Sequence, residues 1–120
     1  MATVSRKVLL VDDNPDTIAV IAAYLRRSGH EVHEAHDGLT AIEIARRVRP
    51  DFMFLDLGLP GMDGLGVART LRSDPQLGRM RIVAVTGSGR EDDRQASLDA
   101  GCDQHLLKPL DLDFVRSLLG

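Results

Sequence analysis

Short apolar runs alternate along this chain with longer segments in which apolar residues recur every three or four positions. The short runs, rich in branched side chains, predict buried strands, and the longer segments predict helices with one apolar face. Five strands are expected, at residues 7–11, 31–35, 52–55, 81–86 and 104–108. Five helices are expected to follow them, at about residues 15–27, 38–49, 64–72, 91–100 and 112–119. Because strands and helices that alternate in this way form right-handed crossovers, the sequence predicts a doubly wound α/β domain with a parallel sheet.

Two of these elements differ from the rest in their pattern of apolar and polar residues. The run at 31–35 alternates apolar and polar residues, which places it near an edge of the sheet. The fourth helix is polar except for Ala96, Leu98 and Ala100, so it has little apolar surface to bury. It is expected to be the loosest helix of the fold.

Reactive or ligating side chains stand at the ends of four of the five strands. They are Asp12 and Asp13 after the first strand, Asp56 after the third, Thr86 at the end of the fourth and Lys108 at the end of the fifth. The carboxyl ends of parallel strands share one rim of the sheet, where loops gather side chains around a ligand. A single acid in such a place can simply face water or cap a helix. The convergence of all of them indicates a functional site, to which the second strand is expected to contribute nothing.

The residue types at this rim suit phosphoryl transfer to a carboxylate. Three clustered acids repel one another unless a cation lies among them, and hard oxygen ligands favour Mg²⁺, with Mn²⁺ as an alternative. Asp56 can then act as the nucleophile and form an aspartyl phosphate. Thr86 and Lys108 would hold the phosphoryl oxygens, one through its hydroxyl and the other through a compact positive charge. Catalysis would rest mainly on positioning and charge neutralisation.

Composition and charge narrow the classes of function. A chain of 120 residues is expected to form one domain that buries a core without disulfides or a structural metal. The formal net charge is −3, from 15 basic and 18 acidic residues. It does not indicate binding to nucleic acid or to an anionic membrane. Arg46, Arg47 and Arg49 form the densest basic group, but they fall at a predicted helix end and are expected to be a solvated face.

The sequence also favours a soluble protein of the cytoplasm. No apolar stretch is long enough for a transmembrane helix, and residues 1–7 lack the apolar core of a signal peptide. The single cysteine, Cys102, cannot form an internal disulfide, which fits a reducing compartment. It is expected to be a small buried side chain rather than a reactive thiol.

Four short motifs together resemble the receiver domain of two-component response regulators. They are Val-Asp-Asp at 11–13, Leu-Asp-Leu-Gly-Leu-Pro-Gly-Met-Asp-Gly at 55–64, Val-Thr-Gly at 85–87 and Leu-Lys-Pro at 107–109. Each is weak alone, but four at these separations are specific, and the resemblance covers residues 1–120 as one receiver domain. It implies a flavodoxin-like fold with strand order 2-1-3-4-5. The motifs are nearest to receivers of hybrid sensor histidine kinases or of single-domain chemotaxis-type regulators.

By this resemblance, the acidic residues bind the metal and accept the phosphoryl group. Asp56 would be phosphorylated by a histidine kinase or a histidine phosphotransfer domain, and it would also be a metal ligand. Asp13 would bind Mg²⁺ directly, Asp12 largely through water, and the Gly58 carbonyl group would be another ligand. Small uncharged residues, Gly58 and Ser88, occupy the two flanking positions that modulate dephosphorylation in the family.

The resemblance also implies a switch. Lys108 and Thr86 would contact the phosphoryl group, and Lys108–Pro109 would be a cis peptide bond, as X-Pro bonds permit. Thr86 would move inward together with an aromatic side chain three residues before the lysine, where this chain has His105. A histidine packs like an aromatic residue but also titrates near neutral pH. The alternative is that His105 is a partly exposed strand residue with no role in switching.

Output is expected through contact at the surface of the fourth helix, fifth strand and fifth helix. The partner would be an unidentified protein or a fused domain, and the chain would be a monomer or a weak homodimer. Two other functions stay open. One is a Mg²⁺-dependent phosphatase with an aspartate nucleophile, although Gly58 stands where such enzymes carry a second acid. The other is a receiver-like or flavodoxin-like binding module that works without phosphorylation.

Overall fold

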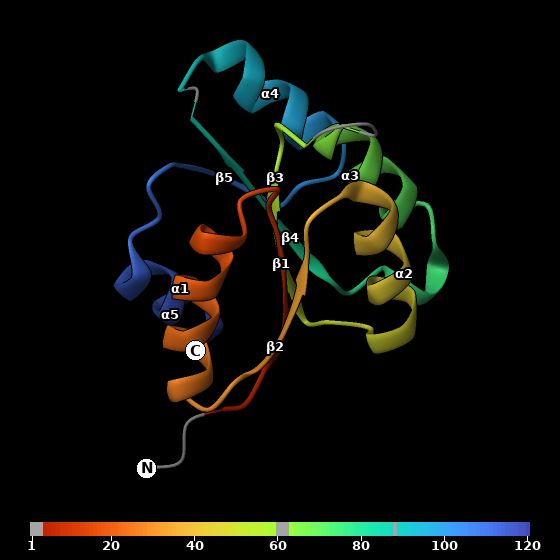
Figure 1. Ribbon diagram of the computed structural model, residues 1–120. Helices are drawn as coiled ribbons and strands as arrows, with labels where there is room; N and C mark the ends of the chain where they lie inside the picture. The colour runs from red at the N-terminus through yellow and green to blue at the C-terminus, as the bar shows by residue number, and fades with distance from the viewer. Residues whose placement is uncertain (1–3, 60–62, 88) are drawn as a thin grey trace.

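Five parallel strands form one sheet in the order β2-β1-β3-β4-β5 (Figure 1). The structure is a computed structural model and describes residues 4–59, 63–87 and 89–120. The strands are β1 (Lys7–Val11), β2 (Glu31–Ala35), β3 (Phe52–Asp56), β4 (Arg81–Thr86) and β5 (Gln104–Leu107). The predicted α/β class and strand order are confirmed, with β3 extending to Asp56 and β5 ending one residue before Lys108.

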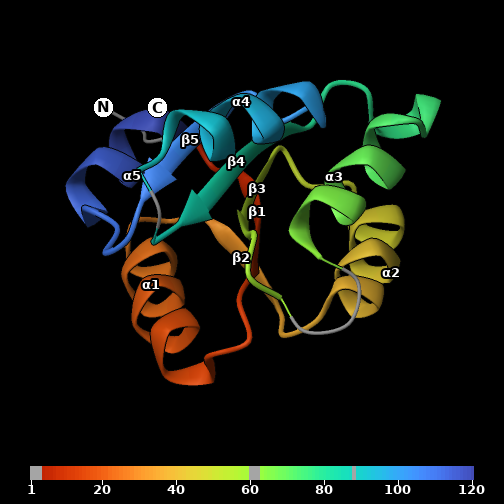
Figure 2. The ribbon, with the colours of Figure 1, turned by 90° about the horizontal axis from the view of Figure 1, so that it is seen from above.

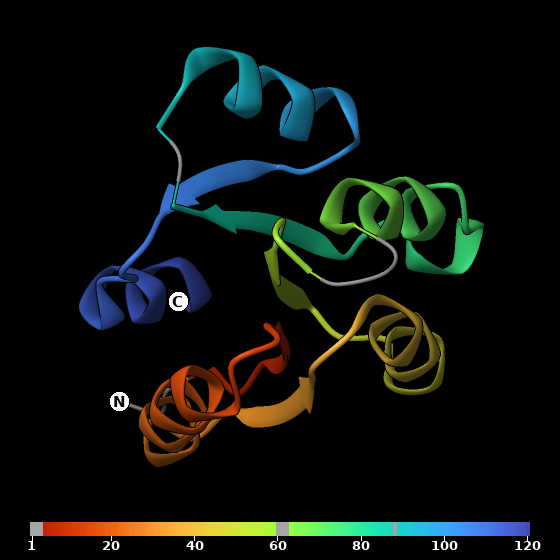
Figure 3. The same cartoon turned by 45° about the horizontal axis from the view of Figure 1, so that its top comes forward.

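Helices cover both faces of the sheet. They are α1 (Pro15–Arg27), α2 (Gly38–Val48), α3 (Gly64–Arg72), α4 (Glu91–Asp99) and α5 (Leu112–Leu119), with a short 3₁₀ turn, η1, at Pro75–Leu77. In Figure 3, α1 and α5 lie on one side of the sheet and α2 and α3 on the other, while α4 lies beyond the β4–β5 edge. The alternation of apolar runs and helical stripes therefore predicted the five strands and five α-helices to within a residue or two.

Polar side chains fix where the helices begin. The Asn14 side chain accepts hydrogen bonds from the backbone N–H groups of Asp16 and Thr17 at the start of α1. Asp37 caps α2 in the same way, and the backbone and side-chain hydrogen bonds from Thr40 lower the pKa of Asp37. Each cap satisfies N–H groups that have no partner within the helix, so the helices start directly behind the strand ends.

The central strands are buried on both faces. On the α2–α3 face, Leu9, Met53 and Ile82 are all 0% exposed; on the α1–α5 face, Val8 and Val83 are likewise 0% exposed. Burial on both faces packs β1, β3 and β4 between the two helix layers, and continuous backbone pairing with their neighbours sets their register. The ends of these strands are therefore rigid supports for the residues that follow them.

Arg72 ties α3 to the far end of the sheet. Its guanidinium donates to the carbonyl groups of Gly101 at 2.8 Å and Met80 at 2.6 Å, and it forms an ion pair with Asp103 at 2.6 Å. The same Asp103 oxygen accepts the Ile82 N–H at 2.8 Å. One side chain thus joins α3, β4 and the α4–β5 loop, at the end of the sheet opposite Asp56.

Cys102 is buried, as expected, and burial raises the pKa of its thiol to about 11. The arginines at 46, 47 and 49 are all exposed, which confirms the solvated face. The longest helix, α1, has 13 residues, and no helix in the described part of the chain is long and apolar enough to cross a membrane.

The buried side of α4 differs from the expectation. Leu98 is 36% exposed, whereas Ser97 is 0% exposed and faces the sheet. The least exposed residues of α4 and its C-cap, at positions 93, 96, 97 and 100, have the spacing of one helical face, and three of the four are alanine or serine. That spacing of small residues, rather than hydrophobicity, was the signal for the buried face.

Candidate functional site

The strand ends meet at one rim of the sheet, which Figure 2 shows from above. Asp56 is the register partner of Val85, and the next N–H, of Leu57, donates to the Val85 carbonyl at 3.1 Å. The Lys108 N–H donates to the Thr86 carbonyl at 2.8 Å, immediately after β5. Backbone hydrogen bonds therefore set the positions of the three residues at the ends of β3, β4 and β5.

Three carboxylates lie together at this rim. Each of Asp12, Asp13 and Asp56 offers an oxygen that lies within 4.8 Å of the others. Asp12 and Asp56 are 8% and 6% exposed, while Asp13 is exposed to solvent. Carboxylates held this close repel one another, and the repulsion is stronger where burial lowers the local dielectric. The cluster therefore favours a bound cation.

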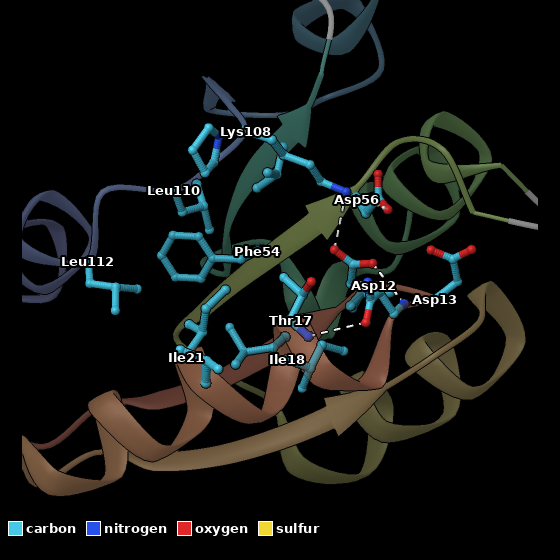
Figure 4. A pocket seen from close by; sticks show the side chains of 16 residues that line it. Asp12, Asp13, Thr17, Ile18, Ile21, Phe54, Asp56, Lys108, Leu110 and Leu112 are labelled. Carbon is cyan, nitrogen blue, oxygen red and sulfur yellow. Dashed lines mark hydrogen bonds and ion pairs between the residues drawn. The ribbon is translucent and has the colours of Figure 1, made fainter.

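Lys108 supplies one positive charge to the cluster. Its Nζ lies 3.1 Å from Asp56 Oδ2 and 3.2 Å from Asp12 Oδ2 (Figure 4). Burial alone would lower the pKa of Lys108, but the hydrogen bonds and charges of Asp56 and Asp12 outweigh it and raise the pKa above the usual value. The ammonium is thus firmly charged and bridges the two buried acids, leaving the cluster with an excess of negative charge.

Backbone N–H groups orient both buried acids. The Gly58 N–H donates to Asp56 Oδ1 at 2.9 Å, and the Asn14 N–H donates to Asp12 Oδ1 at 2.9 Å. In each carboxylate, Oδ1 is held by the loop and Oδ2 faces Lys108. The two carboxylates are therefore held in place before any ligand binds.

A glycine lets α3 start directly behind Asp56. The Gly64 N–H donates to the Leu57 carbonyl at 3.4 Å. A Cβ on Gly64 would lie 2.6 Å from Leu57 Cα and 2.7 Å from the Asp56 carbonyl oxygen, which is closer than real atoms approach. The tight packing of these two backbones needs glycine, so the motif at 55–64 has a structural as well as a chemical reason for Gly64.

A cavity of about 760 Å³ adjoins the acids. Figure 4 shows its apolar side, where Ile18 and Ile21 of α1 face Phe54, Leu110 and Leu112. Asp12, Asp13, Asp56 and Lys108 lie along its other side. The space is thus polar at the strand ends and apolar between α1 and the segment that follows β5.

Thr86 and Gly58 line a second, smaller hollow of about 260 Å³ on the other side of the rim. Asp63 and Asp93 line it too, and Thr86 is half-buried there. The structure therefore brings Asp12, Asp13, Asp56 and Lys108 into one cluster and puts Thr86 at the adjacent strand end. Ser88 lies outside the described residues, and the Lys108–Pro109 peptide bond is cis.

Among the described residues β2 adds no side chain to the acid cluster, but the end of this strand supports the backbone of Asp12. The Ala35 carbonyl at the end of β2 accepts the Asp12 N–H at 3.1 Å, and the next residue, His36, places its Nδ1 3.2 Å from the Asp12 carbonyl oxygen. These contacts hold the backbone of Asp12 rather than its carboxylate.

His105 lies on β5 beside α4 and is half-buried. Its Nδ1 lies 3.0 Å from the hydroxyl oxygen of Ser97, the buried residue of α4. The sequence analysis singled out His105 and missed Ser97, because it looked for apolar residues on this helix and not for the spacing of its small ones.

The donor set fits a divalent cation of the Mg²⁺ type. Three carboxylates with oxygens within 4.8 Å of one another are hard ligands, and one ammonium neutralises only part of their charge. Asp13, which is exposed, can bind a cation that keeps several of its waters.

Comparison with known proteins gives one family. A family model described as the response regulator receiver domain matches residues 8–119. The response regulator PleD of Caulobacter vibrioides is 37% identical over 107 residues, which make up 89% of this chain and 24% of PleD. The chain thus spans about a quarter of that relative.

Two solved structures have similar folds. The receiver domain of the sensor histidine kinase PA1611 from Pseudomonas aeruginosa, with a magnesium ion coordinated in its active-site cleft, is 34% identical with a TM-score of 0.86; the match covers 97% of this chain and 95% of that chain. The phosphorylated cyanobacterial phytochrome response regulator RcpA is 33% identical with a TM-score of 0.82, over 97% of this chain and 89% of that chain.

Proposed function

The chain belongs to the response regulator receiver domain family, and from this premise we propose that it accepts a phosphoryl group on Asp56 with the help of Mg²⁺. The observation that carries the proposal is the cluster itself. Asp56 is buried, oriented by the Gly58 N–H, and placed 3.1 Å from the Lys108 ammonium beside two further acids. The magnesium in the PA1611 receiver and the phosphorylated state of RcpA support the same chemistry here.

In the proposed reaction an Asp56 carboxylate oxygen attacks the phosphorus of the donor. A new O–P bond forms while the P–N bond of a phosphohistidine, or the P–O bond of an acyl phosphate, breaks and leaves its electron pair on the donor. Asp12 and Asp13, with Asp56 and the Gly58 carbonyl, would hold Mg²⁺, which supplies positive charge that offsets the negative charge of the phosphoryl oxygens. Lys108 and Thr86 would bind the remaining phosphoryl oxygens.

Lys108 must change partners during this reaction. Its ammonium bridges Asp56 and Asp12 in the unphosphorylated site, and an acyl phosphate on Asp56 carries its negative charge farther out from the strand end. The long flexible stem of lysine allows its head group to follow that charge. We propose that this transfer of Lys108, together with an inward movement of Thr86, carries the signal from the site to β5.

The proposed donor is a histidine kinase or a histidine phosphotransfer domain, and the proposed output surface is the face formed by α4, β5 and α5. Leu98, Leu107 and Phe114 are 36%, 52% and 43% exposed on these elements, so the face offers apolar surface to a partner. Phosphorylation would shift the population of two arrangements of this face.

A phosphatase is a poorer fit. Gly58 brings no carboxyl group to the position two residues after Asp56, where a general acid and base would be needed. The two other acids of the cluster, Asp12 and Asp13, are taken up as the proposed metal ligands. The chain would turn over its own phosphoryl group without acting on a separate substrate.

Intact mass spectrometry tests the proposal. Wild type is incubated with Mg²⁺ and acetyl phosphate and compared with Asp56→Asn and with a sample that contains excess chelator. The expected result is one added phosphoryl group in wild type alone. Asp51→Asn is the matched control, because Asp51 is an exposed acid just before the other end of β3, and this variant should be phosphorylated like wild type. Equal phosphorylation of Asp56→Asn would contradict the proposal.

A further inference from the structure

A polar contact that the proposed chemistry does not use lies between α4 and β5. The hydroxyl oxygen of Ser97 lies 2.8 Å from the carbonyl oxygen of Arg94 and 3.0 Å from His105 Nδ1. Ser97 is 0% exposed, so a histidine ring that reaches it must be turned under α4 rather than toward solvent. The contact joins the edge strand of the sheet to the buried side of the helix.

The number of protons decides how this contact is made. A serine hydroxyl has one proton, so it donates to one acceptor at a time. If Ser97 donated to His105 Nδ1, the Ser97 hydroxyl oxygen and the Arg94 carbonyl oxygen would lie 2.8 Å apart with no proton between them. If Nδ1 carries the proton instead, both short contacts are hydrogen bonds. His105 then donates to Ser97, and Ser97 donates to the Arg94 carbonyl.

We infer that neutral His105 is protonated on Nδ1 and that Ser97 relays its hydrogen bond to the backbone of α4, which ties the helix to β5. Ser97 is thus a positioning residue for the His105 ring. The relay requires a ring that can donate a hydrogen bond. Histidine can do so, whereas a phenylalanine ring in the same place has no proton to donate.

The rest of α4 makes this tie important. Leu98 is 36% exposed and Ala96 is only half-buried, so the helix buries little apolar surface. A helix held by few apolar contacts opens locally more easily than its neighbours. The relay is therefore one of the few contacts that hold α4 against β5. If the relay holds, α4 and the His105 ring respond together to a phosphoryl group on Asp56. This regulatory consequence of the relay rests on the proposed function.

The first test is the tautomer of His105 in the unphosphorylated wild-type protein. The ¹⁵N shifts of the ring are followed at increasing pH until they no longer change, so that the neutral ring is observed. The expected spectrum has protonated Nδ1 and unprotonated Nε2, and it reverts toward the usual Nε2-protonated form in Ser97→Ala. An Nε2-protonated ring in wild type would overturn the inference.

The second test is a double-mutant cycle on amide hydrogen exchange in α4. Ser97→Ala and His105→Phe are each expected to speed exchange about three- to tenfold, as the loss of one buried hydrogen bond implies. The double variant should exchange no faster than the single ones, because both changes break the same relay. Alanine is the better helix former, so faster exchange in Ser97→Ala cannot come from helix propensity.

Gln95→Ala is the matched control at an exposed position of the same helix, where only a surface contact to Asp99 is lost, and its exchange should not become faster. Unaltered exchange in Ser97→Ala, or effects of the two changes that simply add, would refute the relay. All of these measurements use unphosphorylated protein. Failure of Asp56 to accept a phosphoryl group would therefore leave them intact, and failure of the relay would leave the phosphorylation test intact.

Discussion

Replacing Lys108 by methionine should change metal binding and phosphorylation in opposite directions. The Lys108 ammonium lies 3.1 Å from Asp56 Oδ2 and 3.2 Å from Asp12 Oδ2. A divalent cation bound by the same acids is repelled by the ammonium. Methionine keeps most of the aliphatic stem and removes the charge, so Lys108→Met should bind Mg²⁺ more tightly.

The size of the effect follows from Coulomb's law and the exposure of the lysine. Two unit charges 4 Å apart interact by about 1 kcal/mol in water and by about 4 kcal/mol at the effective dielectric typical near a protein surface. Because the Lys108 side chain is 36% exposed, solvent screening places the change near the lower end, at about 1–2 kcal/mol. That corresponds to roughly five- to thirtyfold tighter binding.

Calorimetric titration of the metal-free protein with Mg²⁺ at low salt measures this change. Lys108→Arg keeps the charge and should shift the affinity less than Lys108→Met does. Lys7→Met removes an exposed lysine at the opposite end of β1 and should leave the affinity unchanged. Phosphorylation of Lys108→Met by acetyl phosphate should nevertheless be slower, since the phosphoryl oxygens lose a positive partner. Unchanged or weaker Mg²⁺ binding would refute the reasoning.

Three further predictions concern the scaffold. Gly64→Ala should lower the free energy of unfolding by about 1–3 kcal/mol and slow phosphorylation, because the added Cβ would push on the backbone that carries Asp56. Urea unfolding measures the change in stability. Gly78→Ala is the control, since its Cβ would lie 3.7 Å from its nearest neighbour. Arg72→Met should cost about 2–3 kcal/mol through its lost hydrogen bonds, seen as a lower urea midpoint with an unchanged slope. Burial, and then the charge of Arg6, lower the pKa of His30 from 6.5, so the unfolded chain takes up the proton first. The stability that neutral His30 contributes is complete above pH 6.5 and is lost as the pH falls below it. His30→Asn keeps an acceptor for the Arg6 N–H, so this variant should lose less of its free energy of unfolding than wild type between about pH 7 and 5.5. An unchanged pH dependence in that variant would contradict the assignment.

The sequence predicted the sheet well because its signals are local. The runs at 8–11 and 52–55 are apolar on both faces, which is typical of a central strand of a parallel sheet. Residues at the ends of such strands share a rim whatever the side-chain details, so Asp12, Asp56 and Lys108 could be grouped before their distances were known.

Contacts between elements could not be predicted in the same way. The Ser97–His105 contact depends on which side of a polar helix faces β5, and no hydrophobic pattern marks that side. The contact of His36 with the Asp12 carbonyl depends on the path of the loop after β2. Arg49 ends α2 in the left-handed conformation, with a φ of 55°. Glycine usually supplies this conformation at a helix end, so the arginine at this position did not indicate it.

The central claim is that Asp56 is the phosphoacceptor, and locating the phosphoryl group tests it most directly. Wild type is treated with Mg²⁺ and acetyl phosphate, and borohydride then reduces the acyl phosphate, so that the modified aspartate is marked as an alcohol. Fragmentation mass spectrometry reads its position. The expected result is a single mark at Asp56, absent when a chelator is present. A mark at Asp12 or Asp13, or a phosphoryl group on Thr86 or a histidine instead, would contradict the claim.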